Sequence, residues 1–300
     1  MSLKNLLLTT TGLSGVFGSA FLAVTPAAAV DFVAPAVDGV NWKVDGLGGS
    51  LANKGFGGGR GAVTVPLGGQ FGFQLDGMAG GFDDRFFGGA AGHLFWRDPA
   101  RGLIGLYGSY SAWDKYGGVH ATHLAAEGEA YWGRWTLQGI AGVENNGSAN
   151  IVTTTISPAI NPTTITTLTQ TVSGGTRFFD QVNLAYYIND NLKAYIGHRY
   201  LGNENALALG GEVGIPMGRG TMAAFFVEGQ VGEDRNNGIW GGVRFYFGAK
   251  DKSLIRRHRE DDPWTDWLPS SLLSITNKFS SSTRSWTCPP GEHVVNGSCQ

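Results

Sequence analysis

The sequence predicts an all-β protein, specifically a transmembrane, antiparallel up-and-down β-barrel of about twelve strands. From about Gly39 to Gly248, apolar and polar residues alternate with a period of two, which is typical of strands with one apolar and one polar face. Several alternating segments are about ten residues long, the length that a tilted strand needs to cross a bilayer. Glycine supplies 48 of the 300 residues without a collagen-like triplet period, and it suits tight turns and crowded strand positions.

The individual strands are defined by this alternation. In one clear segment, Phe71, Phe73 and Leu75 fall on one face, while Gln74 and Asp76 fall on the other. The same pattern predicts strands over residues 40–50, 58–66, 69–80, 85–96, 102–112, 119–132, 134–144, 177–188, 191–201, 205–215, 220–231 and 238–248.

The composition of the apolar face favours a membrane over water. It is nearly free of charge, with Asp180 and His198 near strand ends as the exceptions. An Arg or Lys there would cost about 2–4 kcal/mol at the bilayer midplane. Aromatic residues gather near the ends of this face, as interfacial girdles require: Trp42, Phe71, Trp96, Trp132, Trp135, Tyr200, Phe245 and Phe247. Alternation alone leaves a secreted soluble β-protein as the alternative.

The N-terminus resembles a targeting segment. Lys4 precedes an apolar stretch that continues to about Val24, and an A-x-A pattern ends at Ala29. This order of features predicts a signal peptide over residues 1–29 that is removed after export, with a single transmembrane anchor as the alternative. The barrel is then predicted over residues 30–248 and a tail over residues 249–300.

The connections between the predicted strands differ at the two ends of the barrel. Those after even-numbered strands are short, and most of those after odd-numbered strands are longer. Because short turns face the periplasm in outer-membrane barrels, both ends of the barrel segment are predicted there. The longest connection runs from about Asn145 to Gly175. Its β-prone stretches, Ile151–Ile156 and Thr163–Val172, form either a hairpin beyond the membrane or a disordered tip.

The last 52 residues differ from the barrel in composition. Lys250–Asp262 is densely charged, and its Arg256–Asp262 cluster either binds a periplasmic partner or the anionic inner rim of the membrane, or serves as a solvated linker. A Ser/Thr-rich stretch follows at Ser280–Ser285. Cys288 and Cys299 are the two cysteines of the chain, and in an oxidising compartment they would pair and close a small loop. These features predict a periplasmic tail that ends in a disulfide-closed loop.

The last predicted strand carries a resemblance to a known family. Ile239–Phe247 ends in an aromatic residue with apolar residues at alternate positions before it, and it resembles the closing strand of bacterial porin-like outer-membrane barrels. In that family the pattern is associated with recognition by the barrel-assembly machinery, so the resemblance implies an outer-membrane location and that machinery as a partner. The chain departs from the pattern by continuing beyond this strand. Lys252–Pro263 resembles tails of uncharacterised exported barrels. No functional residue carries over from either resemblance.

The polar face carries charges of both signs that would line the lumen. The candidate lumen residues are Arg60, Arg85, Glu127, Glu129, Arg199, Glu212, Glu228 and Arg244. Opposite unit charges about 4 Å apart attract by roughly 4 kcal/mol at an effective dielectric of about 20, so these side chains should pair. They form either a selectivity constriction or a network that neutralises buried charge. About twelve strands lie between barrels that side chains fill and those that leave an open channel.

The predicted function is a porin-like barrel for passive diffusion of small solutes, with outer-membrane lipid as its surroundings. The alternative is a non-conducting structural or surface-interaction barrel that acts through the 145–175 loop or the tail. A net charge of −2 without a basic surface argues against nucleic acid as a partner.

Catalytic and metal-binding patterns are weak in this sequence. His120 and His123 point to opposite faces of a strand, which argues against a metal site. Ser109, Ser111, His93, His123 and His198 could serve a lipid hydrolase, but no G-x-S-x-G motif accompanies them. No enzyme activity and no cofactor are therefore expected.

Overall fold

The computed structural model describes residues 34–157, 164–233, 236–263, 267–289, 292, 294–295 and 298–299. The predicted signal peptide lies outside these residues. Residues 34–300 form one compact unit.

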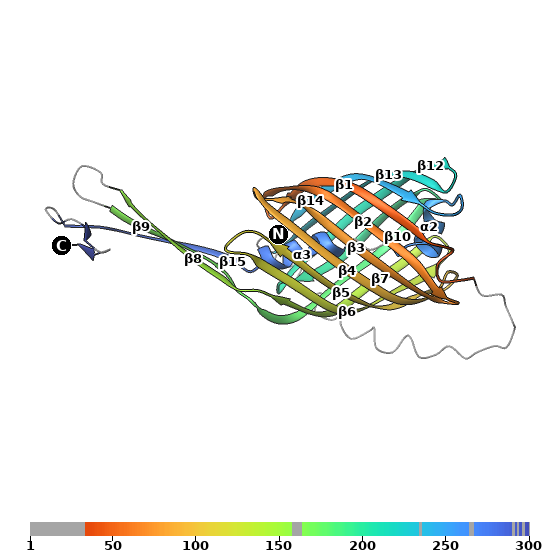
Figure 1. The fold of residues 1–300 in the computed structure, drawn as a ribbon, viewed down its shortest axis with the longest axis horizontal. Helices are drawn as coiled ribbons and strands as arrows, with labels where there is room; N and C mark the ends of the chain where they lie inside the picture. The colour runs from red at the N-terminus through yellow and green to blue at the C-terminus, as the bar shows by residue number, and fades with distance from the viewer. Residues whose placement is uncertain are drawn as a thin grey trace, which may run out of the picture. The chain divides into compact units, whose positions relative to one another are not determined.

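Twelve antiparallel strands close into a barrel, as the sequence predicts (Figure 1). They are β1 (Asn41–Leu51), β2 (Lys54–Gly68), β3 (Phe71–Phe82), β4 (Arg85–Asp98), β5 (Gly102–Trp113), β6 (Val119–Trp132), β7 (Trp135–Asn146), β10 (Gly175–Asn189), β11 (Leu192–Leu201), β12 (Glu204–Gly218), β13 (Thr221–Gly232) and β14 (Gly238–Phe247). The barrel closes where β1 pairs with β14. Closure leaves none of these twelve strands with an unpaired edge.

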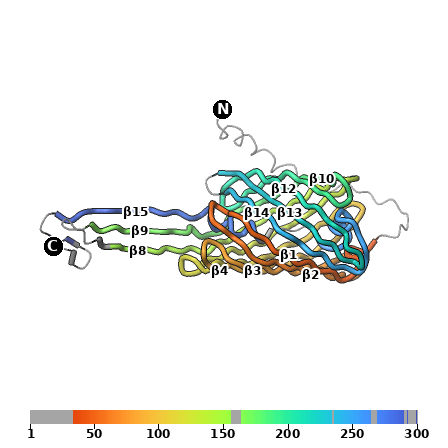
Figure 2. Tube along the Cα trace, turned by 90° about the horizontal axis from the view of Figure 1, so that it is seen from above, coloured from red at the N-terminus to blue at the C-terminus, as the bar shows by residue number. Residues whose placement is uncertain are grey.

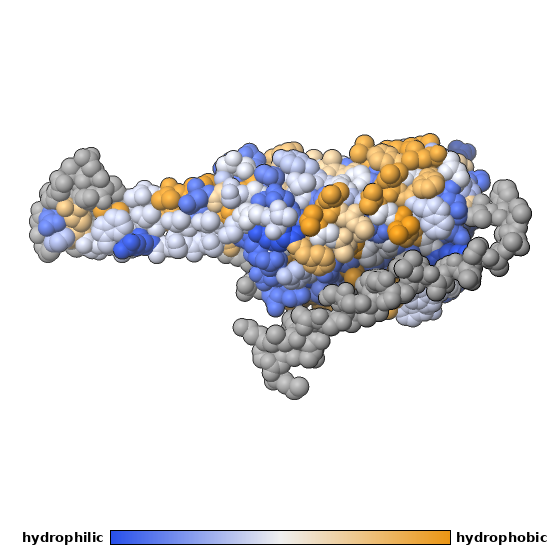
Figure 3. Space-filling model, turned by 90° about the horizontal axis from the view of Figure 1, so that it is seen from below, coloured by the Kyte–Doolittle hydropathy of each residue, from blue (hydrophilic) through white to orange (hydrophobic). Residues whose placement is uncertain are grey.

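The polar face of the strands points into the barrel and the apolar face points outward. On β3, Gln74 and Asp76 are buried, whereas Phe71, Phe73 and Leu75 are exposed. Apolar side chains accordingly gather over the outer wall of the barrel in the view of Figure 3. An apolar exterior around a polar interior is the reverse of a water-soluble β-sheet protein.

The connections at one end of the barrel are shorter than the sequence suggests. Three connections after odd-numbered strands, expected to be longer, are two-residue turns at 52–53, 83–84 and 202–203. Both residues in each turn have positive φ, as tight hairpin turns of this kind require. After the first turn, β2 begins at Lys54 and not at the predicted residue 58. The prediction missed this start because the glycines there have no side chains to show the alternation. A Cβ on Gly58 would lie 2.3 Å from the carbonyl oxygen of Ala79, so the neighbouring strand needs glycine there.

A second sheet, here called the arm, continues from the barrel between β7 and β10 (Figure 2). It contains β8 (Ala149–Ser157), β9 (Thr164–Val172) and β15 (Phe279–Thr287) in the order β15-β9-β8. The structure therefore supports the hairpin alternative for the long connection, and the tip at 158–163 lies outside the described residues. We call this end of the barrel the arm end and the opposite one the short-turn end.

The chain after β14 contacts the barrel through two helices, whereas the sequence predicted a separate tail. Helix α2 (Leu254–Glu260) lies against the short-turn end, where Leu254, Arg257 and Arg259 bond to Asn191, Gly220 and Gly133. Helix α3 (Trp267–Thr276) packs against the inner residues of β4, β5, β6 and β11. The chain therefore runs through the lumen from the short-turn end to the arm end.

The physical reason is the chemistry of the two helices. Leu272, Leu273 and Ile275 of α3 are fully buried in one core with lumen side chains such as Trp113, and the serines of the same helix, Ser270, Ser271 and Ser274, are also buried. A helix that combines small polar serines with apolar residues can pack inside a polar barrel. In the sequence alone, the same composition resembles a linker. None of the helices in the described part of the chain is long and apolar enough to cross a membrane.

Beyond β15 the predicted disulfide between Cys288 and Cys299 is confirmed. It joins the ends of a small loop that contains β16 (Val294–Val295) and β17 (Ser298–Cys299).

Candidate functional site: the charged lumen

Seven of the eight predicted lumen residues lie inside the barrel. The buried ones are Arg60, Glu127, Glu129, Arg199, Glu212, Glu228 and Arg244. Arg85 is the exception, because it is the first residue of β4 and is exposed at the arm-end rim, next to the 83–84 turn. Its position in the alternation is correct for the inner face, but the strand begins there and the lumen does not extend past it.

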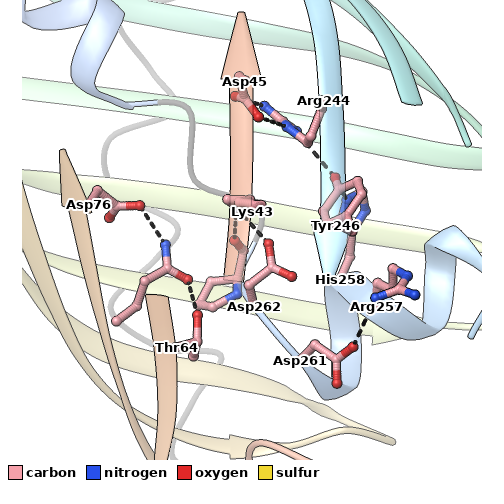
Figure 4. Close-up of polar contacts among 12 residues, drawn as sticks. Lys43, Asp45, Thr64, Asp76, Arg244, Tyr246, Arg257, His258, Asp261 and Asp262 are labelled. Carbon is pink, nitrogen blue, oxygen red and sulfur yellow. Dashed lines mark hydrogen bonds and ion pairs between the residues drawn. The ribbon is translucent and has the colours of Figure 1, made fainter. Parts of the chain in front are cut away.

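A chain of ion pairs inside the barrel joins β1, β2, β14, β12 and β11, and Figure 4 shows its Asp45–Arg244 pair. The register places Asp45 of β1 opposite both Arg60 of β2 and Arg244 of β14. Nε of each arginine donates to Asp45 across 2.8 Å. Arg244 also lies 3.3 Å from Glu212, which in turn lies 3.3 Å from Lys193. These five groups, three cations and two carboxylates, therefore pair with one another near the place where the barrel closes.

Two further groups of paired polar side chains extend this network. The His93 ring lies between carboxylates, with Nε2 2.8 Å from Asp76 and Nδ1 2.9 Å from Glu127. Arg199 lies 3.2 Å from Glu228. Among the predicted lumen charges, Arg199 thus pairs with Glu228 and Arg244 with Glu212, as the Coulomb argument anticipates.

Glu129 is held by uncharged donors instead. The Tyr131 hydroxyl donates to it across 2.6 Å, and Gln138 Nε2 donates across 2.9 Å. These bonds satisfy a carboxylate that has little access to water.

The segment after β14 completes the network at the short-turn end. Lys43 Nζ lies 2.6 Å from Asp262, and Arg97 donates to the carbonyl oxygen of Asp261 across 3.1 Å. His258 of α2 bonds the hydroxyl groups of Tyr187 and Tyr246 at 2.7 and 3.0 Å. Figure 4 shows Asp262 and His258 beside the inner face of β1 and β14. The lumen charges therefore have partners on the threaded chain as well as on the wall.

Sequence reasoning missed these partners for different reasons. Arg97 follows His93 and Phe95 on the inner face of β4, but the predicted strand stopped at residue 96. Extending the alternation by one residue would have found it. No local pattern links Asp262 or His258 to the lumen, because their partners lie on distant strands.

A second docking point lies near the arm end. Ser274 Oγ of α3 donates to Glu144 across 2.6 Å, and Asn146 donates to the Ser274 carbonyl oxygen across 3.0 Å. Asn277 donates to the carbonyl oxygen of Leu201 across 2.8 Å. These bonds fix the end of α3 to β7 and β11, just before the chain enters the arm.

The same region contains the residue types of a hydrolase relay, but not an open site. Ser109 Oγ lies 3.3 Å from His123 Nδ1, and His123 Nε2 lies 3.5 Å from Glu144. All three side chains are buried, and the ring of Phe179 packs against His123. Since Glu144 also accepts the bond from Ser274, this relay supports the docking of α3. His120, expected on the opposite face from His123, is partly exposed and stacks on Tyr110.

No metal-binding cluster occurs among the residues that the structure describes. Beyond the strands, burial raises the pKa of Asp261 at the end of α2 to about 6, although the neighbouring Lys252 acts to lower it. In the 83–84 turn, partial burial acts to raise the pKa of Asp83, but ion pairs with Lys115 and Lys54 outweigh it and lower that pKa.

No protein-family model matches the chain, and no curated protein matches it. Among solved structures, it is similar to a membrane protein from a study of in-meso crystallization, at 12% identity and a TM-score of 0.46, over 82% of this chain and 99% of that one. It is also similar to the β-domain of the Bordetella autotransporter BrkA, at 12% identity and a TM-score of 0.40, over 70% and 98% of the two chains. A third is the anion-selective porin from Comamonas acidovorans, at 9% identity and a TM-score of 0.23, over 69% and 98%. At these values the likeness assigns neither a family nor an activity.

Proposed function

We propose that this protein is a bacterial outer-membrane anchor that holds the arm outside the cell, and that its folded barrel is closed to solutes. The observation that carries the proposal is the course of the C-terminal segment. It passes through the lumen, and all nine residues of β15 then pair with β9. The C-terminal segment therefore contacts both the barrel wall, through α3, and the arm, through β15.

Membrane insertion is supported by the outer surface of the barrel. Leu75, Leu106 and Leu209 are exposed on three different strands, as hydrocarbon contact requires. Trp42 and Phe247 stack with ring centroids 3.7 Å apart near the short-turn end, where an interfacial girdle is expected. A closed barrel also satisfies the backbone hydrogen bonds of its wall without water.

Closure is supported by what fills the lumen. The apolar residues of α3 are packed into the wall, and the charges on the wall pair with one another or with the threaded chain. A water-filled diffusion path would instead leave such side chains hydrated. The lumen charges are therefore best explained as a neutralising network, the structural alternative that the sequence left open.

The orientation is argued from the longest connections, between β5 and β6, between β7 and β10 and between β13 and β14, which all lie at the arm end. With the short turns in the periplasm, the arm and the disulfide-closed loop lie outside the cell, and α2 lies at the periplasmic mouth. Under this proposal the last part of the chain is external, in contrast to the periplasmic tail that the sequence suggested.

Passive diffusion of small solutes is the second candidate. It is favoured by the polar inner wall, where Glu212, Arg244 and Glu228 would line a water path if α2 and α3 left the barrel. The two candidates differ in whether the folded, full-length chain conducts.

The test is single-channel conductance of the refolded mature chain in a planar bilayer, combined with protease treatment of intact cells that express it. We expect an inserted, heat-modifiable protein without conductance steps, and cleavage within the arm from outside. Steady steps whose ion preference changes in Glu212→Ala but not in the rim variant Arg85→Ala would support diffusion instead. An arm that external protease cannot reach would contradict the anchor proposal.

A further inference from the structure

The outer edge of β8 is a long open strand edge. In the arm, as far as the structure describes it, β8 pairs with β9 on one side and ends the sheet on the other. Its backbone N–H and C=O groups on that side are available to another strand. Thr153, Thr154 and Thr155 are exposed, and Val152 is 59% exposed.

This edge lacks the features that normally prevent strand pairing between molecules. Ala149–Ser157 has the sequence ANIVTTTIS, without a charged residue, a proline or a glycine. Natural proteins usually protect exposed edges with lysines, prolines, bulges or a covering loop. The opposite edge, β15, carries Arg284 near its middle. Of the two edges, β8 is thus the one suited to receive a further strand.

The small size of the arm sheet also favours the addition of a strand along β8. It has three strands, and most of the described side chains of β8 and β15 are exposed. Small sheets need a buried apolar face or further strands to be stable. Pairing along β8 would extend the sheet where its composition is β-branched and uncharged.

Strand direction selects the kind of partner. β8 leaves the barrel, β9 returns and β15 leaves again, so both edge strands run away from the membrane. A copy in the same membrane would present its β8 in a parallel direction. A copy in a facing membrane would present it antiparallel, which is the slightly more stable pairing. Two β8 edges related by a two-fold axis are self-complementary, and no like charges oppose each other.

We infer that β8 is a homotypic contact, through which copies in facing membranes join their three-stranded arms into one sheet. The partner is a second copy of this chain, bound edge to edge by antiparallel β8 strands. The inference rests on the proposed function, because it requires the arm to lie outside the membrane.

The test uses the full mature chain in two populations of lipid vesicles that carry different dyes. Clustering is followed by light scattering and by dye co-localisation. We expect clustering with the wild type and its loss in Thr153→Lys/Thr155→Lys, because lysines on an edge prevent strand pairing. The matched control is Thr283→Lys/Ser285→Lys. It places the same charges on the opposite edge in the same two rows of the sheet, and it should cluster like the wild type.

The outcomes separate this inference from the proposed function. Wild-type vesicles whose arms are cut by external protease but that do not cluster would overturn the homotypic contact and leave the anchor intact. Clustering that persists in Thr153→Lys/Thr155→Lys, or pairing found solely between copies in one vesicle, would also overturn it. If external protease cannot cut the arm, whichever way the barrel has inserted into the vesicle membrane, the anchor proposal itself is contradicted. Heat-modifiability of each variant confirms that the barrel has folded.

Discussion

Asp45 is the residue at which strand register most directly determines the chemistry of the lumen. Its carboxylate accepts from Arg60 on one neighbouring strand and from Arg244 on the other, because the same β1 position faces both. Burying any of these charges alone would be costly, since the lumen offers little water. Each therefore depends on the others for its stabilisation inside the barrel.

Replacing Arg244 tests this dependence. Arg244→Ala leaves Asp45 with Arg60 and Glu212 with Lys193, so that two carboxylates lose one cation. We expect a loss of about 1–3 kcal/mol in the free energy of unfolding, because the buried oxygens of both carboxylates lose hydrogen bonds from the guanidinium while each keeps one cation. The measurement is urea unfolding of the refolded chain, followed by tryptophan fluorescence. Arg85→Ala, at the exposed rim, should change it by less than about 0.5 kcal/mol. Equal effects of the two variants would contradict the buried network.

Among the elements, β12 illustrates how alternation divides a strand between two environments. Ala206, Ala208 and Glu212 are buried in the lumen, while Leu207 and Leu209 are exposed on the outside. A one-residue slip would expose the whole apolar set to the lumen, so the pattern also determines the register. The same logic applies to the exceptions on the outer face. There, Asp180 and His198 lie 3.1 Å apart and bond to each other.

A charge on the outer face of β12 tests the lipid-facing surface. Leu209 is 53% exposed in the middle of the strand. Leu209→Arg should cost about 2–4 kcal/mol if this position meets the bilayer midplane. We expect a marked drop in the folded, heat-modifiable fraction on gels after expression in cells, with Leu209→Ala as the control for lost side-chain volume. Normal assembly of Leu209→Arg would show that the position does not face lipid.

For the molecule as a whole, the decisive feature is the course of the chain after β14: α2 lies at the short-turn end, α3 packs inside the barrel, and β15 belongs to the arm. Because these elements are contacted at the short-turn end, inside the barrel and in the arm, undocking of α3 should affect both the lumen and the arm. This coupling explains why the lumen contains partners for the threaded chain, such as Lys43 for Asp262.

A charge within α3 tests this coupling. Leu273 has no exposed surface, and Leu273→Asp would place a carboxylate without a counter-charge in the packed lumen. We expect α3 to undock, so that conductance steps emerge and β15 loses its protection from hydrogen exchange. Val152→Asp, on the exposed surface of the arm, is the control, and it should show neither conductance steps nor a loss of hydrogen-exchange protection in β15. A variant Leu273→Asp that folds with β15 protected and without conductance would contradict the coupling.

Much of the barrel was predictable from residues close together in the chain. The alternation determines the twelve strands, their inner and outer faces and seven of the eight lumen residues, because a strand has a period of two regardless of its partners. The pairing of Cys288 with Cys299 was equally predictable, since the chain has two cysteines. Glycines hid the true start of β2, and the exposed rim position of Arg85 depends on where the wall ends.

The sequence by itself therefore determined the barrel, its inside-out polarity and its disulfide. Only the tertiary structure decided that the chain after β14 returns through the lumen and completes the arm. The contacts that hold this segment join residues far apart in the chain, such as Lys43 and Asp262, which are separated by 219 positions. No local period marks such a contact. It exists because a closed barrel creates a buried, charged space that the C-terminal segment fills with matching groups.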